Sequence, residues 1–387
     1  MNIEEQVKKI INDIKLYGDL AIIKYTKKFD RINIELNQLK INEKTKLLYF
    51  KKLNKNTKNI IDSAYRNIFS FHKNELKYIK NYWEYKNKDI KLGQKLTSIE
   101  LVGVYVPGGL FSYFSTVLMS CIPAKIAGVK KIILATSLRN ITPELIYASR
   151  ICGVNDIYCV GGPMAIAAFA FGTKTIPKVD IIVGPGNIYV TEAKRQVFGY
   201  VGIDMLAGPT EIAVICDKTA KPLFVAYDLM SQLEHDKNSK GFVFSENVSV
   251  LNQIKKNISK NFIGQIVFKK LNLEKSIQHI NKIAPEHLEI IHKNADYIFK
   301  KIKHSGTIFI GNYTPVVVGD YYAGPSHILP TSSTAKFYSG ISVMTFLKRI
   351  NFIKYNKNSF LKDAGNIIKL AELEGLKLHV GAIKIRT

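Results

Sequence analysis

Cysteine is scarce in this sequence of 387 residues, which contains only four. Cys121, Cys152, Cys159 and Cys216 form no C-x-x-C pair, and each lies in an apolar stretch. Small disulfide scaffolds are much richer in cysteine, and thiolate metal sites normally use closely spaced pairs. We therefore predict four reduced thiols in the core and no disulfide framework.

Long hydrophobic runs are also missing, since no stretch of 18 or more residues is wholly apolar. A transmembrane helix needs about 20 such residues, so no membrane span is predicted. The first residues lack the order of a basic, then apolar, then small-residue leader. They instead predict an amphipathic helix from Ile3 to about Lys28, interrupted at Gly18-Asp19. We expect a soluble cytoplasmic protein.

Acidic residues are few relative to basic ones, 31 against 56, which gives a net charge of +25. A basic surface can indicate nucleic-acid binding. Here the lysines are spread along the chain among Asn and Ile, and arginine, the usual reader of phosphates and bases, is scarce. We favour a general bias of composition over a nucleic-acid surface, although the positive field would still attract anionic ligands.

Two kinds of organisation follow one another along the chain. Residues 1–100 read as helical, with Lys- and Asn-rich faces, and a second helix is expected from about Thr45 to Leu76. From Leu101 onward short β-branched runs alternate with helical patterns, and this rhythm starts again after Gly208. Such alternation is typical of α/β proteins with doubly wound parallel sheets. We predict two incomplete Rossmann-like sheet domains.

The expected domains are assigned as follows. Residues 1–104 and 212–340 form a first α/β domain with a helical N-terminal part, and residues 105–211 form an inserted second α/β domain. Residues 341–387 form a helical segment and a tail. A tail of this length cannot bury a core of its own, so it should pack on another domain or on another subunit.

Glycine-rich turns follow two of the expected strands, at Pro107–Gly109 and Gly184–Asn187. Neither matches the dinucleotide fingerprint G-x-G-x-x-G, and the P-loop motif is absent as well. Ligands of doubly wound sheets bind at the carboxyl ends of the strands, where these turns lie. The turns could therefore let a ligand approach the backbone closely, or they could be purely structural.

The segment Ala284–Glu289 carries a carboxylate next to an imidazole. Pro285 suits a first helical position, which would place Glu286 and His287 in the first turn of a short helix. Glu286 could then simply complement the helix dipole. Alternatively, Glu286 and His287 are two acid–base groups that serve successive proton transfers.

A further set of polar residues could bind a metal ion. Gln232 and His235 are three apart at the end of an expected helix from Pro222 to Asp236, and a polar, solvated helix end is the alternative. Asp320 lies in a Gly/Pro-rich loop and His379 near the C-terminus. Together they provide the nitrogen and oxygen ligands that suit a cation such as Zn²⁺. Spacing alone does not bring them together.

Taken together, the ordered motifs resemble those of histidinol dehydrogenases, and the similarity extends over almost the whole chain. The motifs that carry it are Gly18–Ala21, Lys27–Asp30, Val102–Gly109, Phe114–Met119, Val183–Arg195, Ala207–Glu211, Ser231–His235, Ala284–Glu289 and Gly319–Pro330.

The resemblance implies a zinc-dependent, NAD-dependent enzyme that oxidises L-histidinol to L-histidine, through L-histidinal held on the enzyme, with two NAD⁺. It also implies a homodimer whose C-terminal tail reaches the partner's active site, so that Glu374 and His379 would serve the other subunit. Glu286 and His287 are then the acid–base pair, with His287 taking the alcohol proton and Glu286 activating water. The zinc ligands implied are Gln232, His235, Asp320 and His379.

The same resemblance assigns ligand contacts. Residues implied to bind substrate are Thr210, His327 and Glu374, together with His287 and the four zinc ligands. NAD contacts are implied for Tyr105, Met164 and Asn187. Met164 stands where the family usually has a glutamine, and a thioether lacks the amide's strong donor and acceptor. Val316 replaces a common acidic residue, and the region from Phe244 to Ile283 is shortened.

Three functions remain to be compared. The first is the histidinol dehydrogenase just described. The second is a non-redox zinc protein on the same scaffold that has lost NAD use, for which Met164 is the only support. The third is a basic nucleic-acid-binding protein, which predicts salt-sensitive binding. The number of ordered motifs favours the first function.

Overall fold

The structure is a computed structural model that describes residues 2–87, 89–108 and 113–387. The chain divides into two compact units. The large unit comprises the residues up to Leu76 together with Ile99–Phe346, and the small unit comprises Lys77–Ser98 together with Leu347–Thr387. Each unit has its own sheets and helices.

Four helices open the chain: α1 (Ile3–Tyr17), α2 (Asp19–Asp30), α3 (Glu43–Lys52) and α4 (Lys55–Lys77). The side chain of Asn2 caps α1 and forms a reciprocal capping box with Glu5. Gly18, at φ +53°, ends α1, so the predicted break is confirmed. The buried stripe of α1, which includes Val7 and Ile14, packs against α7 (Gly162–Phe171) and α8 (Ile188–Val197).

The first parallel sheet has the strand order β5-β4-β3-β6-β7. Its strands are β3 (Leu101–Tyr105), β4 (Lys131–Thr136), β5 (Asp156–Cys159), β6 (Ile181–Val183) and β7 (Gly202–Ile203). The helices α5 (Phe114–Ile126) and α6 (Pro143–Cys152) pack on each other, as do α7 and α8. Of the predicted glycine-rich turns, Gly184–Asn187 follows β6, and Pro107 and Gly108 follow β3, while Gly109 lies outside the described residues. Strands β3 and β6 are the neighbouring pair at which the strand order reverses.

The second parallel sheet repeats that order as β10-β9-β8-β11-β12. Its strands are β8 (Glu211–Cys216), β9 (Lys240–Ser245), β10 (Ile266–Lys270), β11 (His287–Ile291) and β12 (Thr307–Ile310). Its helices are α9 (Pro222–Leu233), α10 (Val248–Asn257), α11 (Leu273–Ile283), α12 (Ala295–Lys301) and α13 (Val316–Tyr321). In both sheets the third, second, first, fourth and fifth strands lie side by side, all parallel, and this confirms the predicted α/β class.

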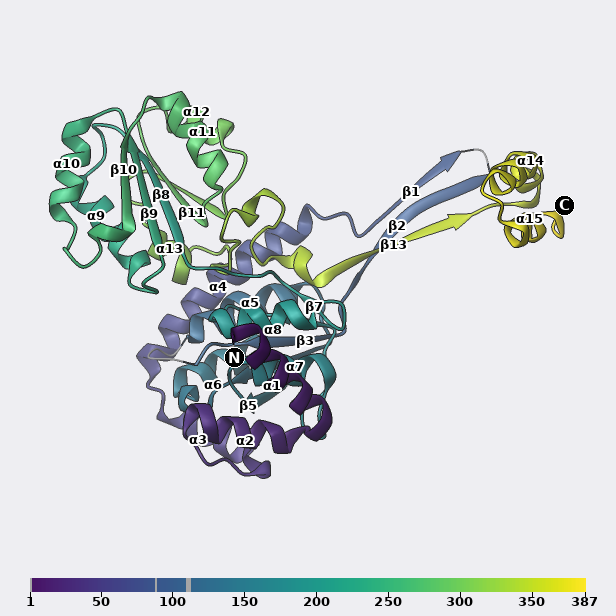
Figure 1. Cartoon of the computed structure of the whole chain (residues 1–387), viewed down its shortest axis with the longest axis horizontal. Coiled ribbons are helices and arrows are strands. Elements are labelled where there is room, and N and C mark those ends of the chain that lie inside the picture. Colours follow the sequence, from purple (N-terminus) through teal and green to yellow (C-terminus); the bar gives the residue numbers. More distant parts are fainter. Residues whose placement is uncertain (1, 88, 109–112) are drawn as a thin grey trace. The chain divides into compact units, whose positions relative to one another are not determined.

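Two apolar layers cover the two faces of the second sheet. Alternate residues of β8 and β11 contribute to each layer, because successive strand side chains point to opposite faces. One layer contains Ile212, Val214 and Ile291 and includes residues of α9 and α10, and the other contains Ala213 and Leu288 and includes residues of α11 and α12. Figure 1 shows α9 and α10 on one side of these strands and α11 and α12 on the other.

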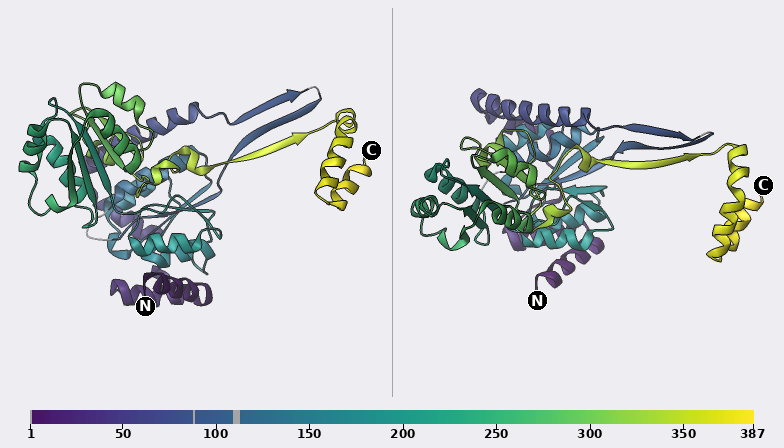
Figure 2. Two further views of the ribbon diagram at one scale, coloured as in Figure 1. Left: turned by 45° about the horizontal axis from the view of Figure 1, so that its top comes forward. Right: turned by 90° about the horizontal axis from the view of Figure 1, so that it is seen from above.

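The small unit contains a three-stranded antiparallel sheet of β1 (Tyr82–Asn87), β2 (Ile90–Ser98) and β13 (Leu347–Lys354), in the order β1-β2-β13. Figures 1 and 2 show the three strands side by side, followed by α14 (Lys357–Leu373) and α15 (Lys377–Lys384). The prediction that residues 1–100 are helical is therefore wrong for Tyr82–Ser98. The segment after Ile341 likewise contains a 3₁₀ turn and strand β13 before its first α-helix, α14.

Two further predictions of local structure are wrong, and both concern the candidate site. His287 begins strand β11 instead of lying in the first turn of a helix, because Ala284, at φ +51°, ends α11 just before Pro285. Asp320 lies in the short helix α13 rather than in a loop. Five short 3₁₀ turns complete the elements: Leu36–Gln38, Leu138–Asn140, Ile263–Gln265, Thr334–Lys336 and Val343–Phe346.

The predicted domain boundaries stay a prediction. In one respect the packing differs from them, since α1 contacts helices of the first sheet, whereas residues 1–104 were grouped with residues 212–340. Among the described residues, no helix combines the length and the apolar character that a bilayer crossing requires.

Candidate active site

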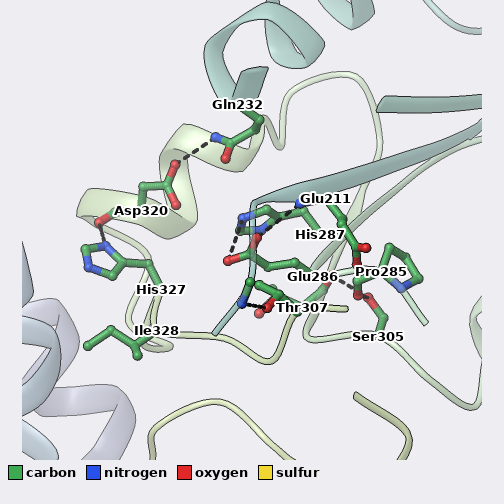
Figure 3. A network of polar contacts seen from close by, with 12 residues as sticks. Glu211, Gln232, Pro285, Glu286, His287, Ser305, Thr307, Asp320, His327 and Ile328 are labelled. Carbon is green, nitrogen blue, oxygen red and sulfur yellow. Dashed lines mark hydrogen bonds and ion pairs between the residues drawn. The ribbon is translucent and has the colours of Figure 1, made fainter. Parts of the chain in front are cut away.

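Glu286 and His287 occupy the junction between α11 and β11. Both side chains are buried, with 8% and 3% of their surfaces exposed. His287 Nε2 lies 3.7 Å from Glu286 Oε1. The backbone of Glu286 is fixed by the N–H of Thr307, which donates to its carbonyl oxygen at 2.9 Å. The structure thus brings the two predicted acid–base groups together on a rigid strand end (Figure 3).

The carboxyl of Glu286 sits in surroundings that favour its protonated form. Burial is the main cause and raises its pKa to about 8, and the negative charges of Asp320 and Glu211 act in the same direction. The backbone N–H of Glu211, which donates to Oε2 at 3.2 Å, and the side chain of Thr210 oppose the shift. A carboxyl with a pKa near 8 can both hold and release a proton around neutral pH.

The imidazole of His287 is shifted in the opposite sense. Burial is the main cause and, together with the nearby His327 and His235, lowers its pKa to about 3. His287 is therefore neutral at physiological pH and has a ring nitrogen able to accept a proton. Two neighbouring titratable groups with pKa values pushed apart are a common sign of an acid–base site.

Gln232 and Asp320 meet in front of this pair. Gln232 is the penultimate residue of α9, only 2% exposed, and its Nε2 donates to Asp320 Oδ2 at 3.1 Å. The carbonyl oxygen of Asp320 lies 2.7 Å from His327 Nδ1. Because a carbonyl only accepts, Nδ1 of His327 carries the hydrogen and its Nε2 is left free. Figure 3 shows Gln232, Asp320 and His327 as one chain of contacts.

His235 lies close to Gln232, Asp320 and His327, but it is not part of helix α9 as the sequence predicts. Helix α9 ends at Leu233, so His235 is in the turn after the helix and does not share a helical face with Gln232. Its charge nevertheless acts on His287, His327 and Asp320, which places it near all three. His287, Asp320 and His327 line one pocket together with Thr307 and Phe309.

The residues predicted to bind zinc fit such a site only in part. No group of three or more His, Cys, Asp or Glu side chains is arranged around a common metal position within residues 2–87, 89–108 and 113–387. Gln232, however, uses its amide nitrogen on Asp320, which leaves the amide oxygen free beside a buried carboxylate and near His235. An amide oxygen, a carboxylate and an imidazole suit Zn²⁺, so these three residues fit as a partial ligand set.

The other two predicted residues of the site lie in the small unit. Glu374 follows α14, and His379 is in α15; both side chains are exposed. Their assignment to the active site of a partner subunit stays a prediction.

This site lies at the amino edge of the second sheet, contrary to the expectation that ligands bind at carboxyl ends. Thr210 precedes β8, Glu286 precedes β11, and α9 runs back so that Gln232 returns to the same edge. The rule of carboxyl ends holds for open sheets that bind nucleotides. Here, polar residues entering two adjacent strands build the site instead.

The residues predicted to contact NAD belong to the first sheet. Tyr105 ends β3 and is buried, and its hydroxyl accepts a hydrogen bond from the N–H of Gly162 at 3.1 Å. Asn187 caps α8 by accepting from the N–H groups of Tyr189 and Val190. Met164 is 2% exposed, within the core cluster. These contacts do not test NAD binding.

A buried ion pair shapes the turn after β6. Lys194 Nζ lies 2.6 Å from Asp204 Oδ1 and also donates to the carbonyl of Gly184. The other oxygen of Asp204 accepts from the N–H of Gly184 at 2.8 Å. Both backbone groups of Gly184, at φ +120°, are thereby fixed, and a Cβ there would overlap the carbonyl of Tyr105.

The sequence did not single out Glu211 as a residue of the site. Its N–H holds Glu286, and its own Oε2 accepts from the N–H of Ser332 at 3.2 Å. A signal was present, because Glu211 directly follows Thr210 in one of the quoted motifs.

Comparisons with known proteins identify the family of the chain. The histidinol dehydrogenase family model matches residues 1–387. The chain is 41% identical to histidinol dehydrogenase from Carboxydothermus hydrogenoformans, over 100% of this chain and 94% of that protein. It is 44% identical to the enzyme from Methanocaldococcus jannaschii, over 98% and 91%.

The fold comparison gives the same answer. The crystal structure of histidinol dehydrogenase from Elizabethkingia anophelis superposes with a TM-score of 0.92 at 36% identity, covering 100% of this chain and 92% of that chain. A full-length family match, two relatives above 40% identity over nearly the whole chain and the fold comparison all agree on one family. The chain belongs to the histidinol dehydrogenase family.

Proposed function

We propose that this protein oxidises L-histidinol to L-histidine with two NAD⁺, through L-histidinal that stays bound, as the last steps of histidine biosynthesis. The observation that carries the proposal is the buried pair of Glu286 and His287, whose pKa values are shifted in opposite directions beside Asp320. Oxidation of the alcohol releases one proton and hydration of the aldehyde releases another, and this pair offers an acceptor for each.

His287 serves the first oxidation. Its neutral ring accepts the hydroxyl proton of the alcohol at Nε2 while hydride leaves the carbinol carbon for NAD⁺. Burial keeps this ring neutral before the reaction, because the low dielectric disfavours the imidazolium. Nε2 lies 3.7 Å from Glu286 Oε1, so the imidazolium that forms faces a carboxyl group.

Glu286 serves the second oxidation. In its ionised form it takes a proton from water at Oε1, and the oxygen of that water attacks the aldehyde carbon. The hydrate that forms would then give its hydride to the second NAD⁺ and become the carboxylic acid. The N–H of Glu211 and the side chain of Thr210 stabilise the ionised carboxylate. Because the pKa of Glu286 is about 8, the ionised fraction increases over the neutral range.

Zinc and NAD complete the proposal. Gln232, His235 and Asp320, with a His379 from a second subunit, would hold zinc, which supplies positive charge to bind the amine and imidazole nitrogens of the substrate. Thr210, His327 and Glu374 would contact the substrate, and Tyr105, Met164 and Asn187 the NAD side. A homodimer with shared sites and a cytoplasmic location remain predictions.

The test is formation of NADH by the purified full-length protein, with L-histidinol and saturating NAD⁺. We expect histidinol-dependent NADH that disappears after chelation and returns with zinc. Tight zinc binding without NADH would instead support the non-redox zinc protein. Binding of nucleic acid that weakens steeply with salt, with no NADH, would support the third function.

A further inference from the structure

Glu289 is a carboxyl group buried in an apolar layer. It is the third residue of β11 and only 1% exposed. As a strand residue two positions after His287, it points to the same face of the sheet. That face carries the layer of Ile212, Val214, Phe309 and Val316. The mechanism proposed above does not use Glu289.

The polar partners of Glu289 are a second carboxyl and one backbone N–H. The side chain of Asp228 in α9 interacts with Glu289, and the N–H of Val316 at the start of α13 acts on the same carboxyl. Among the described residues, no donor forms a hydrogen bond with either Oε of Glu289. Cys216 is the other titratable group near Glu289, and burial raises the pKa of its thiol, so it is uncharged.

Glu289 is buried and Asp228 is half-buried, and two interacting carboxyl groups with so little access to water cannot both be ionised at reasonable cost. If one carboxyl is protonated, its O–H donates a hydrogen bond to the other, which thereby gains the donor that it otherwise lacks. Consistent with this, burial raises the pKa of Asp228 to about 6 and that of Glu289 well above its usual range. The pair therefore holds a proton that neither carboxyl would hold in water near neutral pH.

Asp228, Val316 and Glu289 each lie one helical turn, or one two-residue strand step, away from a residue of the candidate site. Asp228 precedes Gln232 by four residues in α9, and Val316 precedes Asp320 by four in α13, one helical turn in each case. Glu289 follows His287 by two, on one face of β11. Helices α9 and α13 also pack on each other.

We propose that Asp228 and Glu289 share one proton and, with the N–H of Val316, clamp α9, β11 and α13 together, which makes them positioning residues for Gln232, His287 and Asp320. The shared proton stands independently, whereas its effect on catalysis rests on the proposed function. An apolar side chain at 289 would fill the layer without the need for a partner. A shared proton instead holds α9 and β11 in one fixed position relative to each other.

The first experiment measures the proton directly. Infrared difference spectra at neutral pH compare the full-length wild type with Glu289→Gln and with Asp228→Asn. We expect both variants to lose the carbonyl band of the same single protonated carboxylic acid, because either amide can donate to the remaining carboxylate. Asp296→Asn, an exposed acid of α12, is the control and should leave that band unchanged. Retention of every acid band in both variants would overturn the shared proton.

The second experiment measures positioning with Glu289→Leu, and Glu289→Gln as the conservative rescue. We expect Leu to lower kcat for L-histidinol about 10- to 100-fold, the scale of a misplacement near 1 Å, and to speed amide hydrogen exchange in α13. Glu289→Gln should restore both kcat and the slow amide exchange of α13. An unchanged kcat and unchanged α13 exchange in the leucine variant would overturn the clamp. Absence of turnover in the wild type would overturn the proposed function instead, and exchange and infrared would still decide the clamp.

Discussion

The side-chain amide of Gln232 in α9 donates a hydrogen bond to Oδ2 of Asp320 in α13 at 3.1 Å. This bond joins two residues that are 88 positions apart in the sequence. Because this contact uses the amide nitrogen, the amide oxygen of Gln232 stays available beside the carboxylate. Asp320 also lines the pocket that contains His287. One hydrogen bond thus holds the proposed metal ligands next to the proposed base.

Removal of the carboxylate of Asp320 should weaken zinc binding. Asp320→Asn keeps the shape of the side chain but removes its charge, and we expect zinc affinity to fall by at least about 10- to 100-fold, the loss typical of even an outer partner of a metal site. Bound zinc is measured after equilibration with a competing chelator. Asp217→Asn, at the far end of β8, is the control. Wild-type affinity in Asp320→Asn would remove this residue from the ligand set.

His287→Asn should lose most activity and still fold. Asparagine fits within the space of the ring but cannot take up a proton, so kcat should fall by about 10²- to 10⁴-fold, the usual contribution of general acid–base catalysis. Initial rates of NADH formation measure the effect, with circular dichroism as the check on folding. His304→Asn, which lies after α12, is the matched control. Full activity in His287→Asn would overturn the acid–base assignment.

The raised pKa of Glu286 should make the metal-free protein less stable as pH rises. Between its ordinary pKa of 4.5 and about 8, the folded state keeps a proton that the unfolded state has lost. Stability therefore falls with rising pH in this window, by at most about 1.4 kcal/mol per pH unit from this group. Glu286→Gln removes the titration. Urea unfolding of both proteins from pH 5 to 8 measures the difference, and parallel curves would contradict the raised pKa.

The ion pair of Lys194 and Asp204 should contribute to stability only as a pair. Lys194→Met leaves the carboxylate of Asp204 buried without its partner, and we expect a loss of about 3–5 kcal/mol in the free energy of unfolding. Addition of Asp204→Asn removes the charge but keeps an oxygen for the N–H of Gly184, so part of the loss should be recovered. Exposed Lys174→Met is the control. A double variant no more stable than the single one would contradict this account.

The family, the α/β fold and the oxidoreductase class that the motifs predicted are confirmed by the whole-chain match. Regular elements with clear end signals were predicted well. Gly18 ends α1 at a positive φ that glycine tolerates, and β12 spans Thr307–Ile310 as expected. These features depend on interactions between residues that are close together in the sequence, so a single sequence is enough to predict them.

The wrong predictions concern segments whose structure depends on contacts with distant parts of the chain. Pro285 resembled a helix start, yet His287 begins β11 because the strand completes hydrogen bonding between β8 and β12. The lysines and asparagines of Tyr82–Ser98 favour a helix, although Trp83 and Tyr85 alternate with polar residues as in a strand. The contact of Gln232 with Asp320 depends on the strand order, which spacing does not encode. The same holds for Asp228 and Glu289.

The stoichiometry of complete turnover tests the central claim most directly. Purified wild-type protein with zinc, a limiting amount of L-histidinol and excess NAD⁺ is followed to completion, with NADH measured by absorbance and L-histidine by amino-acid analysis. The proposed two oxidations at one carbon predict two NADH and one L-histidine for each L-histidinol consumed. One NADH with free aldehyde, or no NADH at all, would contradict the account.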